Sequence, residues 1–182
     1  DGRLFAYWPL TGQGIGSRIA EIDINENRLD RAMGRLVSAS ELIKQLPTST
    51  HAQLLEGARK YLKAGFLMAR GETRSARDLF RVALEMRSQL LPVDHIHLMR
   101  NRLMLARTEF LLKDYESSEQ ILLDEIAIRE KSSHVSDAEL AVACNFLAEQ
   151  YYLSGRLSDA EPIYERTLEL RRATLAPGHR LI

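Results

Sequence analysis

The 182-residue sequence lacks several features that would point to particular classes of protein. It contains a single cysteine, Cys144, which excludes a disulfide framework within the chain. Five prolines and ten glycines are too few for a turn-rich β architecture. No apolar run approaches the roughly 18 residues that a membrane-spanning helix needs. What these absences leave is a helical fold.

An excess of charge of either sign is also missing. The chain has 25 basic and 25 acidic side chains, so the total gives no reason to expect a nucleic acid or an anionic membrane as partner. The apolar opening from Leu4 to Leu10 has neither the basic flank nor the small-residue cleavage site of a signal peptide. We therefore expect a cytoplasmic protein that neither binds nucleic acid nor inserts into a membrane.

What is present is a repeat. The alanines Ala64, Ala106 and Ala148 lie 42 residues apart, within the range of solenoid repeats. Each begins a triplet whose two later members, seven residues apart, lie on a second helix, because antiparallel helices approach closely only where facing side chains are small. The triplets are Ala64, Ala76 and Ala83; Ala106, Ser118 and Glu125; Ala148, Ala160 and Thr167; and, with a longer linker, Ala20, Ala32 and Ala39.

Larger apolar and turn residues support this reading. Gly71 and Gly155 are expected to end first helices. Thr73 and Asp114 are the expected caps of second helices. The apolar residues expected to fill the space between hairpins are Leu36, Phe80, Leu105, Leu122, Leu147 and Tyr164. The prolines between hairpins, where a helix must stop, are Pro47, Pro92 and Pro177.

The segment from Phe146 to Arg166, FLAEQYYLSGRLSDAEPIYER, resembles the tetratricopeptide repeat (TPR), specifically the 42-residue variety of kinesin light chains and many bacterial regulators. In that variety a Pro-Asp-His-like linker follows the second helix, as Pro92 to His95 do here. The match is weaker in the third hairpin, where Lys113 replaces the turn glycine and Glu125 an expected alanine.

The resemblance covers about residues 13 to 182 and implies an all-α fold, a right-handed superhelical solenoid of antiparallel helix pairs. Residues 1–14 are expected to be a lead-in or capping segment. About four hairpins are expected in residues 15–182, at 15–50, 51–94, 97–136 and 137–178. Because the chain begins at Asp1 and ends as if another helix were starting, we expect it to be a piece of a longer protein.

The resemblance also implies a concave groove lined by the second, fifth, ninth and twelfth positions of each first helix. The candidate peptide-binding residues taken from these positions are Tyr61, Met68, Arg100, Leu103, Arg107, Phe110, Asn145, Glu149 and Tyr152. Rings, guanidinium groups and amides in one groove suit a peptide, since they combine apolar anchoring with backbone hydrogen bonds. The alternative is that these side chains pack against neighbouring helices.

Charge is uneven in the second hairpin. Between residues 57 and 90, eight basic side chains stand against three acidic ones. They are Arg59, Lys60, Lys63, Arg70, Arg74, Arg77, Arg81 and Arg87 against Glu72, Asp78 and Glu85. This excess suits an acidic partner, and the alternative interpretation is a solvated helix face.

The remaining motifs do not form a predicted catalytic, metal or cofactor site. His95 and His97 have a spacing that can bind zinc, but without further ligands nearby they are interpreted as linker residues. Residues 12–16 resemble a dinucleotide loop, yet no strand precedes them, so a flexible lead-in is expected. Cys144 is expected to be a buried structural thiol. We therefore predict no metal, no cofactor and no enzyme activity.

The sequence thus predicts a non-catalytic scaffold that binds a protein or peptide partner. The alternative from another class is a regulatory, sensor or dimerisation segment of a larger bacterial signalling protein, such as a kinase, a cyclase or a transcription activator. Self-association remains open under both hypotheses.

Overall fold

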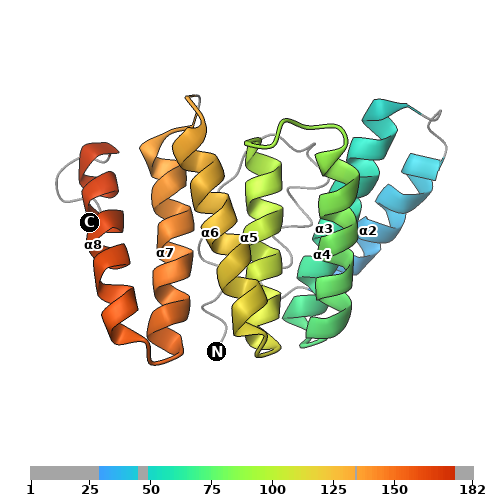
Figure 1. Ribbon diagram of the computed structural model, residues 1–182. Coiled ribbons are helices and arrows are strands. Elements are labelled where there is room, and N and C mark those ends of the chain that lie inside the picture. The colour runs from blue at the N-terminus through green and yellow to red at the C-terminus, as the bar shows by residue number, and fades with distance from the viewer. Residues whose placement is uncertain (1–28, 45–48, 134, 175–182) are drawn as a thin grey trace. The chain divides into compact units, whose positions relative to one another are not determined.

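The structure, a computed structural model, describes residues 29–44, 49–133 and 135–174, and within them it contains seven helices and no strand (Figure 1). The helices are α2 (Leu29–Lys44), α3 (Thr50–Ala69), α4 (Thr73–Ser88), α5 (Ile96–Leu111), α6 (Tyr115–Lys131), α7 (Asp137–Leu153) and α8 (Leu157–Thr174). The predicted all-α fold class is confirmed. The expected lead-in, residues 1–14, and the first helix of the first hairpin lie outside the described residues, so the four-hairpin division stays a prediction.

The chain divides into two compact units, residues 1–91 and 92–182. In the N-terminal unit α2 contacts α3, and α3 and α4 form an antiparallel pair (Figure 1). In the C-terminal unit α5 pairs with α6 and α7 with α8, while α6 packs against α7. The helices α5 and α7, which are the first members of their pairs, also contact each other directly.

Small side chains are buried at the contacts within hairpins. Ala64, Ala76 and Ala83 have no exposed surface, so α3 and α4 pack through them as the spacing predicts. In the C-terminal unit the corresponding positions are all 2% exposed or less, namely Ala106, Ser118, Glu125, Ala148, Ala160 and Thr167. The prediction is confirmed in these three hairpins, whereas the side chains of the earlier triplet lie outside the described residues.

The side chain of Leu36 lies outside the described residues, and the other larger apolar residues follow the prediction with one exception. Phe80, Leu122 and Leu147 are at most 1% exposed, and Leu105 is 6% exposed. Tyr164 was expected to be covered as well, but 36% of its surface is exposed. Tyr164 lies on α8, and its ring is on a face of that helix that the described helices leave partly uncovered.

Side-chain caps begin several helices. Ser49 accepts a hydrogen bond from the backbone nitrogen of Ala52 at 3.2 Å, and Asp114, as predicted, accepts one from Ser117 at 3.1 Å. The prediction for Thr73 is wrong. The N-cap of α4 is Glu72, which makes no side-chain capping bond, and Thr73 is already the first helical residue.

The described turns inside hairpins pass through the left-handed backbone region. Gly71 and Gly155 have φ angles of 81° and 80°, which glycine adopts without strain. Lys113 occupies the corresponding position of the α5–α6 turn with a φ of 66°. A residue with a Cβ is strained there, so this turn stores conformational energy that the other two do not.

Replacing Lys113 by glycine is expected to raise the free energy of unfolding by about 1 kcal/mol, because the strain at the turn is removed. Thermal unfolding followed by circular dichroism measures the effect, and 1 kcal/mol corresponds to about 2–4 °C for a chain of this size. The reciprocal change Gly155→Ala should lower the midpoint, although no heavy atom lies within 4 Å of the added Cβ. A lower midpoint for Lys113→Gly would contradict the strain argument.

Glu125 stands where the repeat pattern has a small residue, and its buried carboxylate is part of a network of ion pairs. Its carboxylate accepts a hydrogen bond from Nη1 of Arg102 at 2.7 Å and one from Nε of Arg129 at 2.5 Å. Arg129 also donates from Nη1 to Oε2 of Glu139 at 3.2 Å. Glu125 and Arg129 are buried, so each ion depends on its partners for the solvation it has lost. The network joins α5, α6 and the start of α7.

Glu125→Ala restores the small residue of the repeat pattern, yet we expect it to lower the free energy of unfolding by about 3–5 kcal/mol, because it leaves Arg129 buried and without its main counter-ion. Urea unfolding measures the change. Glu116→Ala, an exposed position on the same helix, serves as the control and should change stability little. If Glu125→Ala were as stable as this control, the network would not hold the third hairpin together.

Candidate binding surface on α5 and α7

Residues predicted to line a groove share one side of α5. Arg100, Leu103, Arg107 and Phe110 recur every three or four residues, the spacing of one helix face. Leu103 is 3% exposed and belongs to the hydrophobic core of the C-terminal unit. The other three side chains are partly exposed. Leu103 therefore packs into the core, whereas Arg100, Arg107 and Phe110 reach the surface.

On α7 the predicted residues form a parallel stripe. Asn145, Glu149 and Tyr152 are spaced by four and three residues, so they lie on one face. Asn145 and Glu149 are partly exposed, and Tyr152 is 58% exposed. Cys144 and Leu147, on the other side of the helix, are at most 1% exposed and join the core. The stripe is thus left outside the packing of the unit.

The two stripes meet at Arg107 and Glu149. Burial lowers the pKa of Arg107, and the nearby charge of Glu149 partly offsets this by raising it. Within the described part of the chain, however, Arg107 makes no hydrogen bond or ion pair at contact distance. A half-buried guanidinium has lost part of its solvation and keeps its donors available to an incoming acceptor.

Tyr164 extends this surface onto α8. Burial raises the pKa of its phenol first, and the proximity of Glu149 and Tyr152 raises it further. The sequence assigned Tyr164 to packing between hairpins, and no local signal in the sequence indicated its exposure.

The predicted residues of the N-terminal unit lie in a different setting. Tyr61 is 3% exposed and packs edge-on against Phe80, with ring centroids 5.4 Å apart. The guanidinium of Arg87 lies 4.9 Å from the centroid of the same ring. Met68 is partly exposed near the end of α3. Tyr61 thus contributes to the packing of its own hairpin, and its use by a partner stays a prediction.

The basic excess of the second hairpin is partly balanced by local pairs. Arg59 donates to both carboxylate oxygens of Glu56, at 2.7 and 2.5 Å, which lowers the pKa of that carboxyl. Arg70 and Glu72 form an exposed pair at 3.1 Å. Exposed pairs of this kind contribute little to stability and leave both charges near solvent. An acidic partner for this hairpin stays a prediction.

The other motifs have structural places. Nδ1 of His95 accepts a hydrogen bond from the backbone nitrogen of His97 at 3.1 Å and so caps α5. Cys144 is fully buried, as predicted, and burial raises the pKa of its thiol. No group of three potential metal ligands occurs among the described residues, and none of the helices in this part of the chain is long and apolar enough to cross a membrane. Residues 12–16 lie outside the described residues.

A second polar cluster joins α6 to the end of α7, and the sequence did not predict it. Tyr151 donates its phenolic proton to Oε1 of Glu119 at 2.7 Å, and Arg156 donates from Nη1 to Oε2 at 2.5 Å. The hydrogen bond from Arg156 is the main cause that lowers the pKa of Glu119. Burial, followed by the hydrogen bond to the Glu119 carboxylate, raises the pKa of Tyr151 to about 12.

Glu119→Gln is expected to lower the pKa of Tyr151, because the negative charge that opposes phenolate formation is removed while burial remains. A folded-state pKa of about 12 against 10.0 for the free side chain also means that Tyr151 contributes stability below pH 10, which is lost as the pH rises toward 12. Carbon-13 NMR of labelled tyrosine measures this pKa. Glu116→Gln is the control, and an equal pKa in both variants would contradict the assigned cause.

Comparisons with known proteins agree with this architecture. The family model described as tetratricopeptide repeat matches residues 62–97 and 140–181. A crystal structure of nearly identical TPR-like repeats, from a Podosopora anserina protein described as a kinesin light chain, is 18% identical with a TM-score of 0.68 and covers 91% of this chain and 78% of its own. The crystal structure of BtubC (BKLC) from P. vanneervenii is 19% identical with a TM-score of 0.73.

The second comparison covers 90% of this chain, which in turn spans 63% of the length of BtubC. No protein with a curated description matches the sequence significantly. At these identities the solved structures establish the fold, while the family model identifies the repeat itself. The chain therefore has the fold of a helical-repeat solenoid, and its residues 62–97 and 140–181 are similar to tetratricopeptide repeats.

Proposed function

We propose that the chain is a non-catalytic scaffold that binds a peptide segment of a protein partner on the surface formed by Arg107, Asn145, Glu149 and Tyr152. The observation that carries the proposal is the state of Arg107, which is half-buried and has no hydrogen-bonded partner among the described residues. Repeat scaffolds of this family typically serve protein interaction, which makes a peptide the natural source of an acceptor.

The surface offers the three kinds of contact that a peptide backbone and its side chains need. Arg107 supplies fixed donors for a carbonyl or carboxylate oxygen. Asn145 and Glu149 supply an amide and a carboxylate that no described residue engages in a hydrogen bond. Tyr152, which is 58% exposed, supplies an amphipathic ring for apolar contact. Because the positive charge of Arg107 and the negative charge of Glu149 lie on neighbouring helices, the surface favours a peptide of mixed polarity over a strongly acidic or basic one.

The other predicted residues have supporting places in this proposal. Arg100 and Phe110 extend the surface toward the two ends of α5, and the buried Leu103 anchors that side of the helix to the hydrophobic core. Tyr61 and Met68 are proposed as the equivalent positions of the second hairpin. Because Tyr61 is almost completely buried, its part is to position neighbouring groups more than to contact the peptide.

The double variant Arg107→Gln with Tyr152→Ala is expected to weaken peptide binding by about tenfold or more, because it removes the donor fork and the exposed ring together. Peptides are first selected on the unchanged protein from an array of short synthetic peptides of randomised sequence. Their affinities for the protein and for the variant are then compared by fluorescence anisotropy. Circular dichroism should show unchanged helicity, since both side chains lie outside the core.

A matched control replaces an arginine and an apolar residue elsewhere on the same unit, Arg172→Gln with Leu123→Ala, both exposed on other helices. This control should bind the selected peptides as the unchanged protein does. Equal loss of affinity in the control and the double variant would refute the proposed surface. Loss of helicity in the double variant would show instead that the two side chains belong to the core.

A further inference from the structure

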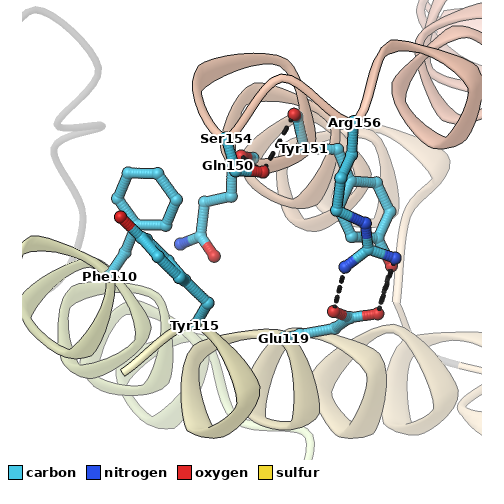
Figure 2. Close-up of a pocket in the computed structure, with 7 residues that line it drawn as sticks. All are labelled: Phe110, Tyr115, Glu119, Gln150, Tyr151, Ser154 and Arg156. Atoms are coloured by element: carbon cyan, nitrogen blue, oxygen red, sulfur yellow. Dashed lines mark hydrogen bonds and ion pairs between the residues drawn. The ribbon is translucent and has the colours of Figure 1, made fainter. Parts of the chain in front are cut away.

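A pocket lies in the C-terminal unit, between the turn that joins α5 to α6 and the turn that joins α7 to α8 (Figure 2). Its volume is about 210 Å³. The residues that carry the argument are Phe110, Tyr115, Glu119, Gln150, Tyr151 and Arg156. Only Phe110 also belongs to the surface on α5 and α7, so the pocket is a separate feature of the unit.

The side-chain amide of Gln150 points into this pocket (Figure 2), although the residue is only 8% exposed. One end of the amide lies 2.5 Å from Oγ of Ser118. That hydroxyl has a single proton, which it donates to the backbone carbonyl of Ala106 at 2.6 Å, so toward Gln150 it can only accept. The amide nitrogen therefore faces Ser118. The amide oxygen faces the pocket, where it receives no hydrogen bond from a described residue, and it is available as an acceptor.

The walls beside this acceptor are aromatic. Phe110 and Tyr115 meet edge-on with ring centroids 5.1 Å apart, and Figure 2 shows them on one side of the Gln150 amide. On the other side lies Tyr151, whose ring is covered by the guanidinium of Arg156 at 4.2 Å from its centroid. The faces of aromatic rings attract cations. The rings of Phe110 and Tyr115 have no such cation among the described residues, so they can receive one from a ligand.

The charges at the rim favour a cation as well. Arg156 pairs with Glu119 at 2.5 Å and with Asp159 at 2.7 Å. One cation and two carboxylates together carry one formal negative charge. The hydrogen bond from Arg156 keeps the pKa of Glu119 below its usual value, so this carboxylate is ionised at neutral pH. A cationic ligand is therefore attracted to the rim, and a ligand carboxylate is repelled.

We propose that this pocket binds the guanidinium group of an arginine side chain from a peptide partner, which donates a hydrogen bond to Oε1 of Gln150 and lies against the rings of Phe110 and Tyr115. The buried acceptor requires an N–H donor, the ring faces attract a cation, and the rim is negative. These three properties are independent of one another, and a guanidinium meets all of them.

The size and exposure of the pocket agree with this ligand. A cavity of about 150 Å³ already accommodates benzene in a protein interior, so a volume of about 210 Å³ admits the smaller guanidinium together with part of its aliphatic stem. Tyr115 is 47% exposed, so the pocket is open to solvent on that side and the cation keeps part of its hydration. A guanidinium is favoured over an ammonium because it is flat, weakly hydrated and donates in fixed directions.

N-acetylargininamide is the probe, because it carries the guanidinium on a neutral backbone. N-acetylcitrullinamide is the matched control, since it keeps the length, the shape and N–H donors but has no charge. The full chain is titrated with each at constant ionic strength, while proton–nitrogen NMR spectra follow the side-chain amide of Gln150 and the backbone amides of Tyr115 and Ser154. We expect saturable shifts with the arginine probe.

The citrulline probe should bind about three- to fivefold more weakly than the arginine probe, which is the contribution of a cation–π contact at an exposed site. N-acetyllysinamide, which carries an ammonium group, should also bind more weakly than the arginine probe.

Two variants test the assigned groups. Gln150→Met keeps the length of the side chain but removes the amide oxygen, and we expect it to weaken binding of the arginine probe about tenfold, as for one hydrogen bond to a charged group. Glu119→Gln brings the rim to neutrality and should weaken binding of the arginine probe while leaving the citrulline probe unchanged. Glu116→Gln, at an exposed position on the same helix, makes the same change in total charge and should alter neither.

Several results would overturn the proposal. One is the absence of a saturable shift up to the solubility limit of the arginine probe. Others are equal affinities of the arginine probe and either the citrulline or the lysine probe, equal binding by folded Gln150→Met, or equal effects of Glu119→Gln and Glu116→Gln.

The variant Arg107→Gln with Tyr152→Ala separates this site from the surface on α5 and α7. It should bind the arginine probe as the unchanged chain does, and loss of probe binding in this variant would place the probe on the other surface. Because the pocket stands on its own geometry, its failure leaves the proposed function of α5 and α7 standing.

Discussion

The close approach of two antiparallel helices through small side chains is the constraint on which the rest of this structure depends. At Ala64, Ala76 and Ala83 no surface remains exposed, so any larger side chain has to push the helices apart. The third hairpin meets the same constraint differently. Glu125 enters the interface only because Arg102 and Arg129 enter with it and neutralise its charge. A network of three charged residues thus stands where the repeat pattern has one alanine.

This packing decides which side chains are left for a partner. Each first helix uses its small and apolar residues against its own second helix and the next hairpin, and what remains is the stripe of Asn145, Glu149 and Tyr152 on α7. The direct contact between α5 and α7 then brings Arg107 of the neighbouring repeat to Glu149. The proposed binding surface is thus the part of the repeat that the stacking of hairpins leaves unburied.

Much of the fold was predictable, because the 42-residue spacing, the turn glycines and the small triplets are local and periodic properties of the sequence. Positions that depend on context were not. Glu72 and not Thr73 caps α4, and Tyr164 is 36% exposed where the repeat pattern predicts a covered ring. The stripes on α5 and α7 followed from the repeat register, whereas the cluster of Glu119, Tyr151 and Arg156 joins residues 32 to 37 positions apart that no local pattern relates.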